Sequence, residues 1–203
     1  MIPYLEVSVI ILSYLLGSIP FGFLLTKMAG YGDIRKIGSG NIGATNVLRT
    51  GDKKLAILTL LLDGGKGAVA VLVVQSIFPD VAPMAGLAAF VGHIYPVWLD
   101  FKGGKGVATA IGVLTALDWQ VGLIVMGLWL LVAYTSRYSS LASLISLGLS
   151  PALVIFFDNG DWMWMAVSML MLIAWKHAAN IQRLLEGKET KIGAERHEPP
   201  APQ

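Results

Sequence analysis

The chain has 203 residues, 55% of them hydrophobic and only 14% charged, and its mean hydropathy is +0.68. Soluble domains carry about 25% charged residues, so this composition excludes a disordered chain, a nucleic-acid-binding arm and an ordinary cytosolic fold. The net charge of +2 says little about partners, and the absence of cysteine excludes disulfides and a cysteine nucleophile.

Seven apolar stretches follow one another along the chain, and we interpret each as a membrane span. They cover residues 3–26, 55–78, 81–99, 106–117, 119–135, 141–157 and 162–175. No basic residue precedes the first stretch, which is typical of a first span rather than a cleaved signal. The fourth is the shortest, so we expect the loop before it to sink below the membrane surface and to be buried in protein. The sequence predicts an all-α integral membrane protein with seven transmembrane helices, one domain over residues 1–188, and a polar, Pro-rich tail over 189–203.

The basic residues indicate which way the chain is inserted. Of the 15 Lys and Arg, all except Lys66 fall in connections that a seven-span count places on one side of the membrane. Because basic residues concentrate in cytoplasmic loops, we expect the N-terminus outside and the C-terminus in the cytoplasm.

The first basic connection carries a glycine-rich, amide-rich segment over residues 38–46, followed by an arginine. Glycines allow backbone N–H groups to converge on an anion, and Arg binds phosphate through two parallel hydrogen bonds. This combination predicts a site for a phosphate monoester, and the alternative is a flexible polar loop. The candidate binding residues are Ser39, Asn41, Thr45, Asn46 and Arg49.

The second span contains two ionisable residues, Asp63 and Lys66, on one helical face. A lysine at membrane depth costs about 2.5–3.5 kcal/mol on insertion scales and usually faces a partner or a polar cavity. Lys66 is therefore either a binding residue or half of a structural ion pair.

A third feature stands at the start of the fourth span, where the sequence reads Lys-Gly-Gly-Lys-Gly over residues 102–106. Free N–H groups at a helix start attract anions. Lys105 is followed by Gly106 rather than Ser or Thr, so the segment is not a Walker A nucleotide loop. We predict an anion site made by Lys102, Gly103, Gly104 and Lys105, and the alternative is a basic anchor at the membrane edge.

Two histidines lie in different settings. His93 precedes a proline-containing break in a span, which favours a structural histidine. His177 shares a helical face with Asn180 and is either a general base, a phosphate ligand, or part of an interfacial amphipathic helix. The three histidines form no recognisable zinc set, and we expect no metal and no cofactor. An enzyme acting on an anionic lipid precursor and a transporter of a phosphorylated solute both fit these features.

The chain resembles the bacterial acyl-phosphate:glycerol-3-phosphate acyltransferases over about residues 17–189. Three motifs carry the resemblance in the same order: residues 38–46, residues 92–109 with the glycine–lysine segment, and residues 180–189 with Asn180 and Arg183. Membership of this family implies seven spans with the N-terminus outside, in agreement with the charge distribution, and a bacterial inner membrane with the active site at the cytoplasmic face.

The resemblance also implies the reaction, transfer of a fatty acyl group from acyl phosphate to the sn-1 hydroxyl of glycerol 3-phosphate. The products are lysophosphatidic acid and phosphate. The implied partners are these two substrates and the lipid bilayer, with no nucleic acid and no obligatory protein partner. The family's catalytic positions match Lys105, Ser143, His177 and Asn180, its substrate-binding positions match Ser39 and Arg49, and Asn41, Thr45 and Lys66 lie nearby as support.

The chemistry is consistent with these residue types. Acyl phosphate is a mixed anhydride, so its carbonyl is already activated and no acyl-enzyme is needed. Cations and N–H donors would hold two phosphates together and stabilise the leaving phosphate. Our hypothesis is that a substrate phosphate oxygen takes the hydroxyl proton while His177 orients a phosphate, and the competing hypothesis makes His177 the general base.

Overall fold

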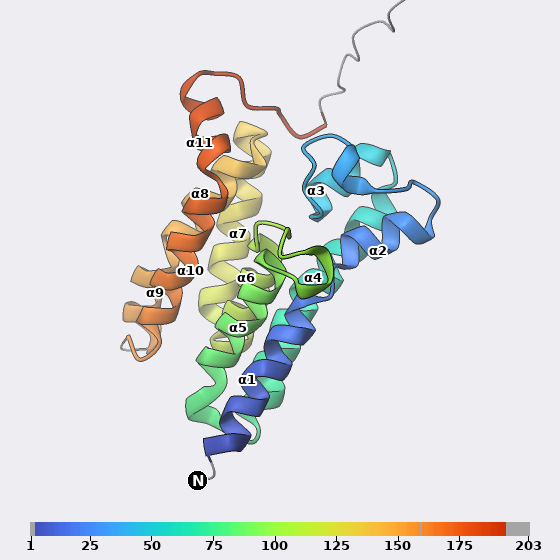
Figure 1. Ribbon diagram of the computed structural model, residues 1–203. Coiled ribbons are helices and arrows are strands. Elements are labelled where there is room, and N and C mark those ends of the chain that lie inside the picture. Colours follow the sequence, from blue (N-terminus) through green and yellow to red (C-terminus); the bar gives the residue numbers. More distant parts are fainter. Residues whose placement is uncertain (1–2, 159, 194–203) are drawn as a thin grey trace, which may run out of the picture.

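The computed structural model describes residues 3–158 and 160–193, and within these ranges the chain is helical and contains no strand. The long helices form one bundle, from which α2 and α3 diverge at the end opposite to the start of α1 (Figure 1). The predicted all-α fold is confirmed. The α-helices are α1 (Pro3–Ser18), α2 (Phe21–Met28), α3 (Ala44–Val47), α4 (Lys53–Gln75), α5 (Ala82–Ile94), α6 (Val107–Leu117), α7 (Trp119–Ser136), α8 (Ser139–Gly148), α9 (Ser150–Asp158), α10 (Met163–Lys176) and α11 (Ala178–Leu185). Short 3₁₀ turns are η1 (Ile34–Lys36), η2 (Leu48–Thr50), η3 (Pro79–Val81) and η4 (Val97–Leu99).

Five helical segments of the described chain are long and apolar enough to cross a membrane: Tyr4–Met28, Lys53–Gln75, Pro79–Leu99, Trp119–Ser136 and Ser139–Asp158. Two of the seven predicted spans are shorter. Helix α6 has 11 residues and helix α10 has 14. At 1.5 Å per residue α6 is about 16 Å long, against a hydrocarbon core of about 30 Å. The structure therefore contains the seven predicted apolar helical segments, of which five have the full length of a span.

Breaks and caps in the helices follow from local sequence. Pro20 lies between α1 and α2, where its missing N–H interrupts the helical hydrogen bonds. Helix α4 begins after Asp52, whose Oδ1 accepts a hydrogen bond from Leu55 N at 2.9 Å. Helix α6 begins after Gly106, which has a left-handed φ of 84° that a residue with a side chain rarely adopts.

Small residues bring the central helices close together. Helix α1 packs on α5, and α4 packs on α6. A methyl group added at Gly17 would overlap the backbone of Ala89, and one added at Gly112 would overlap the carbonyl oxygen of Gly64. Such close backbone approach is the usual means of association between helices in lipid. It fixes α5 against α1 and α6 against α4.

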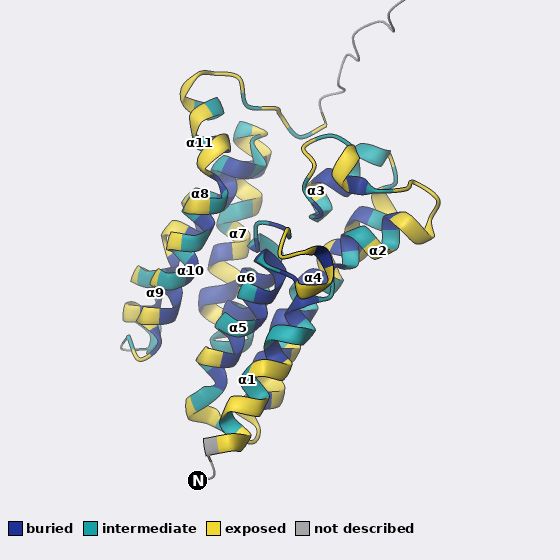
Figure 2. Cartoon of the chain, viewed as in Figure 1, coloured by how far each residue is buried: buried dark blue, intermediate teal, exposed yellow. Residues whose placement is uncertain are grey.

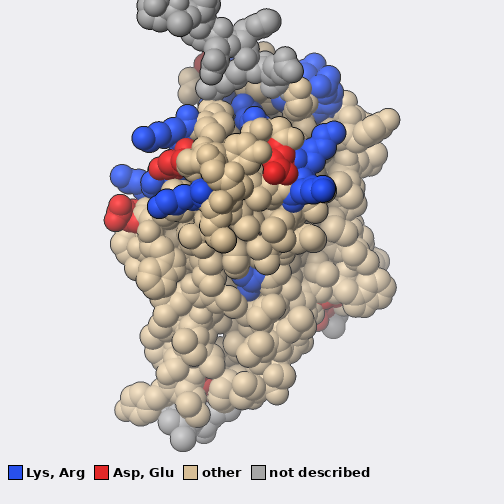
Figure 3. Space-filling model, turned by 90° about the vertical axis from the view of Figure 1, so that its right-hand side faces the viewer, with Lys and Arg blue, Asp and Glu red and all other residues tan. Residues whose placement is uncertain are grey.

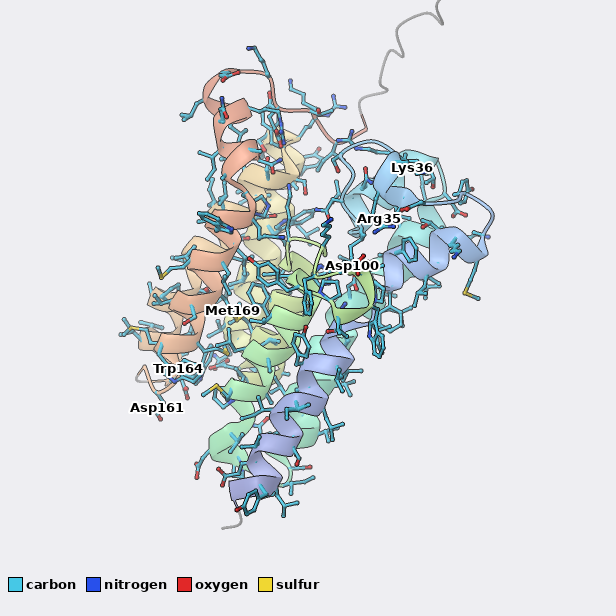
Figure 4. The ribbon with its side chains drawn as sticks, viewed as in Figure 1. Arg35, Lys36, Asp100, Asp161, Trp164 and Met169 are labelled. Atoms are coloured by element: carbon cyan, nitrogen blue, oxygen red, sulfur yellow. The ribbon has the colours of Figure 1, made fainter. Side chains whose placement is uncertain are left out.

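The surface of the bundle is apolar along its length and charged at one end. Exposed residues of the long helices, coloured yellow in Figure 2, include large apolar side chains such as Leu61 and Phe156, which are 64% and 79% exposed. On the face shown in Figure 3, Lys and Arg gather at the end opposite to the start of α1. Arg35 and Lys36 lie at this end, and Asp161 and Trp164 lie toward the other (Figure 4). The basic end also carries the loops that contain the candidate site.

Candidate active site

The loop over residues 38–49 is organised by one buried amide, Asn46, which is 2% exposed. Its Oδ1 accepts a hydrogen bond from Ser39 N at 2.9 Å. Its Nδ2 donates to the carbonyl oxygens of Ile37 at 2.9 Å and Asn41 at 2.8 Å, with a longer contact to Ile34 O. A buried polar group with this many partners is part of the loop's framework. Asn46, predicted as a binding residue, thus holds the loop together from inside.

The other polar residues of this loop lie nearer its surface. Ser39 and Thr45 are exposed, and Arg49 is half-buried. The Thr45 hydroxyl lies 3.3 Å from the Ser139 hydroxyl at the start of α8, so the loop reaches across to the C-terminal half of the chain. Asn41 Oδ1 accepts a hydrogen bond from Gly43 N at 3.1 Å, which folds the loop locally. Ser39 and Arg49 remain predicted phosphate ligands, and the Arg49 side chain lies against Gly38 of the same loop.

The loop over residues 102–106 is tied to the C-terminal end of α5. Gly103 N donates to Ile94 O at 3.2 Å, and Gly104 N donates to His93 O at 3.1 Å. These bonds place Lys105 at the start of α6, where its ammonium donates to Asn180 Oδ1. Lys102 is exposed. The predicted loop therefore contributes one cation, Lys105, to the cluster around Asn180.

A carboxylate, Glu189, joins this cluster from the segment after α11. It accepts hydrogen bonds from Asn180 Nδ2 at 2.5 Å, Ser140 Oγ at 2.7 Å and Arg183 Nε at 2.8 Å. Because Asn180 donates its amide N–H to Glu189, its oxygen is directed to Lys105. The cluster thus joins α6, α8 and α11, which are far apart in the sequence.

Burial and neighbouring charges set the protonation of Lys105 and Glu189. Burial lowers the pKa of Lys105 to about 8, Glu189 raises it in part, and Arg183, Lys176 and Arg49 lower it further. Desolvation raises the pKa of Glu189, but the hydrogen bonds from Ser140, Asn180 and Arg183 outweigh it and the net shift is downward. Near neutral pH the cluster thus holds an ammonium and a carboxylate. The effect of Arg49 shows that the 38–49 loop lies close enough to act on Lys105.

His177 lies in the same cluster as a neutral ring. It is 2% exposed, and burial together with the charge of Lys105 lowers its pKa to about 4. His177 Nδ1 lies 2.8 Å from Ile173 O. A carbonyl oxygen only accepts hydrogen bonds, so we assign the proton to Nδ1, and Nε2 then carries a lone pair.

Two other predicted residues lie outside this cluster. Lys66 is buried in an ion pair, 2.8 Å from Asp63 Oδ1, and also donates to Ile19 O at 2.8 Å. Ser143 is buried in α8, where its hydroxyl donates to Ser139 O at 2.8 Å and accepts from Trp129 Nε1 at 3.0 Å. Both remain predicted site residues whose observed partners are protein groups.

Glu189 is the residue of the cluster that falls in the predicted C-terminal tail. It closes the third motif, at residues 180–189, so the signal was present in the same segment that identified Asn180. A carboxylate is not expected among phosphate ligands, which is why residue type alone does not select it. The described part of the predicted tail, residues 189–193, also contacts the bundle, because Ile192 N donates to Arg137 O at 2.7 Å. Residues 194–203 of that tail lie outside the described residues.

The fold and this cluster define a helical membrane protein with a lysine, amide and carboxylate site at its basic end. A family model described as glycerol-3-phosphate acyltransferase matches residues 7–187. The chain belongs to the glycerol-3-phosphate acyltransferase family. It is therefore an integral membrane acyltransferase of phospholipid synthesis, and the transport alternative is set aside.

Individual relatives match almost the whole chain. The glycerol-3-phosphate acyltransferase of Mesorhizobium japonicum is 57% identical, covering 91% of this chain and 95% of the relative. That of Paramagnetospirillum magneticum is 55% identical, covering 90% and 92%. The crystal structure of PlsY (YgiH), an integral membrane glycerol 3-phosphate acyltransferase, in its glycerol 3-phosphate form is 40% identical, with a TM-score of 0.88 and coverage of 93% and 96%. Its lysophosphatidic acid form is 39% identical, with a TM-score of 0.86 and coverage of 93% and 95%.

Proposed function

We propose that this acyltransferase uses acyl phosphate as its direct donor and acylates the sn-1 hydroxyl of glycerol 3-phosphate, giving lysophosphatidic acid and phosphate. The observation that carries the proposal is the Lys105 ammonium, held by Asn180 beside Arg183 and close to Arg49. A lysine ammonium has three donors, of which Asn180 takes one. The others suit a phosphate oxygen. The solved relative in its glycerol 3-phosphate and lysophosphatidic acid forms supports a phosphate-bearing acceptor and product.

The reaction needs no covalent enzyme intermediate. The sn-1 oxygen forms a bond to the acyl carbonyl carbon, the bond from that carbon to the bridging phosphate oxygen breaks, and inorganic phosphate leaves with the electron pair. Lys105 and the arginines would stabilise the negative charge that grows on the leaving phosphate. The hydroxyl proton passes either to a phosphate oxygen or to His177. Positioning two anions side by side is the main task of such a site.

The tautomer of His177 favours a role toward the hydroxyl. A neutral ring with its proton on Nδ1 offers Nε2 as an acceptor, so it can accept a hydrogen bond from a substrate hydroxyl but cannot donate one to a phosphate. This supports the general-base hypothesis over the one in which His177 orients a phosphate. His177→Ala should then lower kcat with little change in KM for either substrate. An unchanged kcat with a raised KM would instead support the hypothesis that a substrate phosphate oxygen takes the hydroxyl proton.

The donor is tested with purified protein in lipid nanodiscs, glycerol 3-phosphate and one of three palmitoyl donors: the phosphate, the coenzyme A thioester or the acyl carrier protein thioester. Equal release of phosphate and lysophosphatidic acid from palmitoyl phosphate alone is the expected result, with the acyl group found at sn-1 by regioselective phospholipase digestion. Turnover of a thioester without added phosphate would contradict it. Lys105→Ala should remove most of the turnover, and Lys54→Ala, at an exposed lysine of the same basic end, is the matched control.

We also propose that all seven apolar helical segments cross a bacterial inner membrane, with the N-terminus outside and the site at the cytoplasmic face. The gathering of basic residues at the end that carries the site supports this orientation (Figure 3). Since the chain has no cysteine, single cysteines report sidedness directly. Asp161→Cys should react with an impermeant maleimide in spheroplasts, whereas Thr190→Cys should react only after permeabilisation. The reverse pattern would overturn the orientation.

A further inference from the structure

A buried charged group lies beneath the 102–106 loop and has no part in the reaction as proposed. Asp63 and Lys66 on α4 and His93 on α5 are 2%, 4% and 4% exposed. Lys66 Nζ is 2.8 Å from Asp63 Oδ1 and also donates to Ile19 O, in the break between α1 and α2. Burying charges within the membrane is costly, so such residues usually mark function.

His93 connects this group to the loop. Its Nδ1 lies 3.5 Å from Asp63 Oδ1 and has no hydrogen-bond partner among the described residues. The other side of the ring supports the loop, because a methyl group added at Gly104 would overlap His93 Nε2. Gly104 N also donates to His93 O at 3.1 Å. The ring therefore sets how close Gly104, and with it Lys105, approaches α5.

The backbone carbonyl of Asp63 anchors the start of α6, on the C-terminal side of Lys105. The Thr109 hydroxyl, in the first turn of α6, donates to Asp63 O at 2.8 Å. Lys105 thus lies between Gly104, which rests on His93, and Thr109, which is bonded to Asp63. Both anchors meet at Asp63, whose carboxylate is held in turn by Lys66.

We propose that Asp63, Lys66 and His93 are positioning residues that fix the Lys105 ammonium beside Asn180, acting through Gly104 and Thr109 rather than on substrate. The proposal rests on the role of Lys105 proposed above. The space between His93 and Gly104 predicts how variants combine. Gly104→Ala should push the 102–106 loop away from the His93 ring, and His93→Ala should let this loop move closer to α5. Together they compensate, because the added methyl enters space that the imidazole has vacated.

The experiment measures kcat and KM for both substrates, and the thermal midpoint, for Gly104→Ala, His93→Ala and the double variant. A displacement of about 1 Å at a catalytic group can cost about 100-fold, so each single variant should lose at least about 10-fold in kcat/KM. The double variant should be more active than either. Gly86→Ala is the control for general packing. Gly86 lies on the same helix as His93, and its added methyl group would meet the side chains of Val113 and Val71. This variant should lower the thermal midpoint and leave kcat unchanged.

Two further measurements separate positioning from folding. Thr109→Val keeps the side-chain shape and removes only the bond to Asp63 O, so it should fold and still lose several-fold in kcat/KM. In a Lys105→Ala background, Gly104→Ala should have no further effect on residual activity. Wild-type-like kinetics in His93→Ala, or equal damage from Gly104→Ala with and without His93, would overturn the positioning role. The donor specificity of the wild-type enzyme tests the proposed reaction separately. The positioning role is judged from ratios of kcat/KM between variants, measured with whichever donor the enzyme uses, so the two proposals can fail independently.

Discussion

The charge state of Lys105 predicts the alkaline limb of the pH profile. Burial lowers the pKa of this ammonium to about 8, and only the protonated form carries the positive charge that neutralises a phosphate. A group with this pKa is about nine-tenths protonated at pH 7 and about one-tenth protonated at pH 9. If the ammonium is required, kcat/KM should fall about 10-fold over that range. An unperturbed lysine, with a pKa of about 10.4, would leave the rate flat there.

The assay follows released phosphate and lysophosphatidic acid at constant ionic strength, with the enzyme-free hydrolysis of palmitoyl phosphate subtracted. Lys105→Arg is the matched control, because a guanidinium stays charged over the whole range and should remove the limb at whatever rate remains. An acidic limb near pH 6 would report the substrate phosphate, since the pKa of His177, about 4, is lower. A wild-type rate that stays flat beyond pH 9, or the same limb in Lys105→Arg, would refute the assignment.

Three other variants test the surroundings of the site. Glu189→Gln removes a carboxylate that raises the pKa of Lys105, so the alkaline limb should move to lower pH. An unchanged limb would show that Glu189 does not set the pKa of the group that the limb reports. Lys66→Met leaves the buried Asp63 carboxylate without its ion-pair partner and should destabilise the protein by about 3–5 kcal/mol, measured by thermal unfolding in detergent. Adding Asp63→Leu should recover most of that loss. Asn46→Ala removes the donor to the buried carbonyl oxygen of Ile34, at about 1–3 kcal/mol, and to the partly buried ones of Ile37 and Asn41. It should lower the thermal midpoint and raise the Kd for glycerol 3-phosphate, which equilibrium dialysis measures.

The sequence predicted most of the helices, because apolar runs of span length leave little choice in lipid. The interruptions were partly missed. The predicted span over residues 141–157 is two helices, α8 and α9, and the second begins with Ser150 followed by Pro151. Serine before proline is a common helix start, so this signal was available within the apolar run. The shortness of α6 was predicted from the same pattern and is confirmed at 11 residues.

Site residues were predictable by type but not by partner. Glycine, amide and basic residues at one end of the molecule indicated an anion site, and Lys105 and Asn180 do meet there. Asn46 and Asn180 are the same residue type in two motifs, yet one amide is used up inside its own loop and the other faces Lys105. The difference depends on which carbonyls the folded loop brings near, and no local pattern in the sequence contains that information.

The presence of Glu189 among cations has a physical explanation. Arg183, Lys176 and Arg49 each lower the pKa of Lys105, because like charges near a partly buried ammonium favour loss of its proton. Glu189 opposes that loss and also turns the Asn180 amide so that its oxygen receives Lys105. Without the carboxylate, the arginines would still attract a phosphate, but the lysine would be less protonated and its direction would be undefined. Glu189 thus keeps Lys105 protonated and, through Asn180, fixes the direction of its ammonium group.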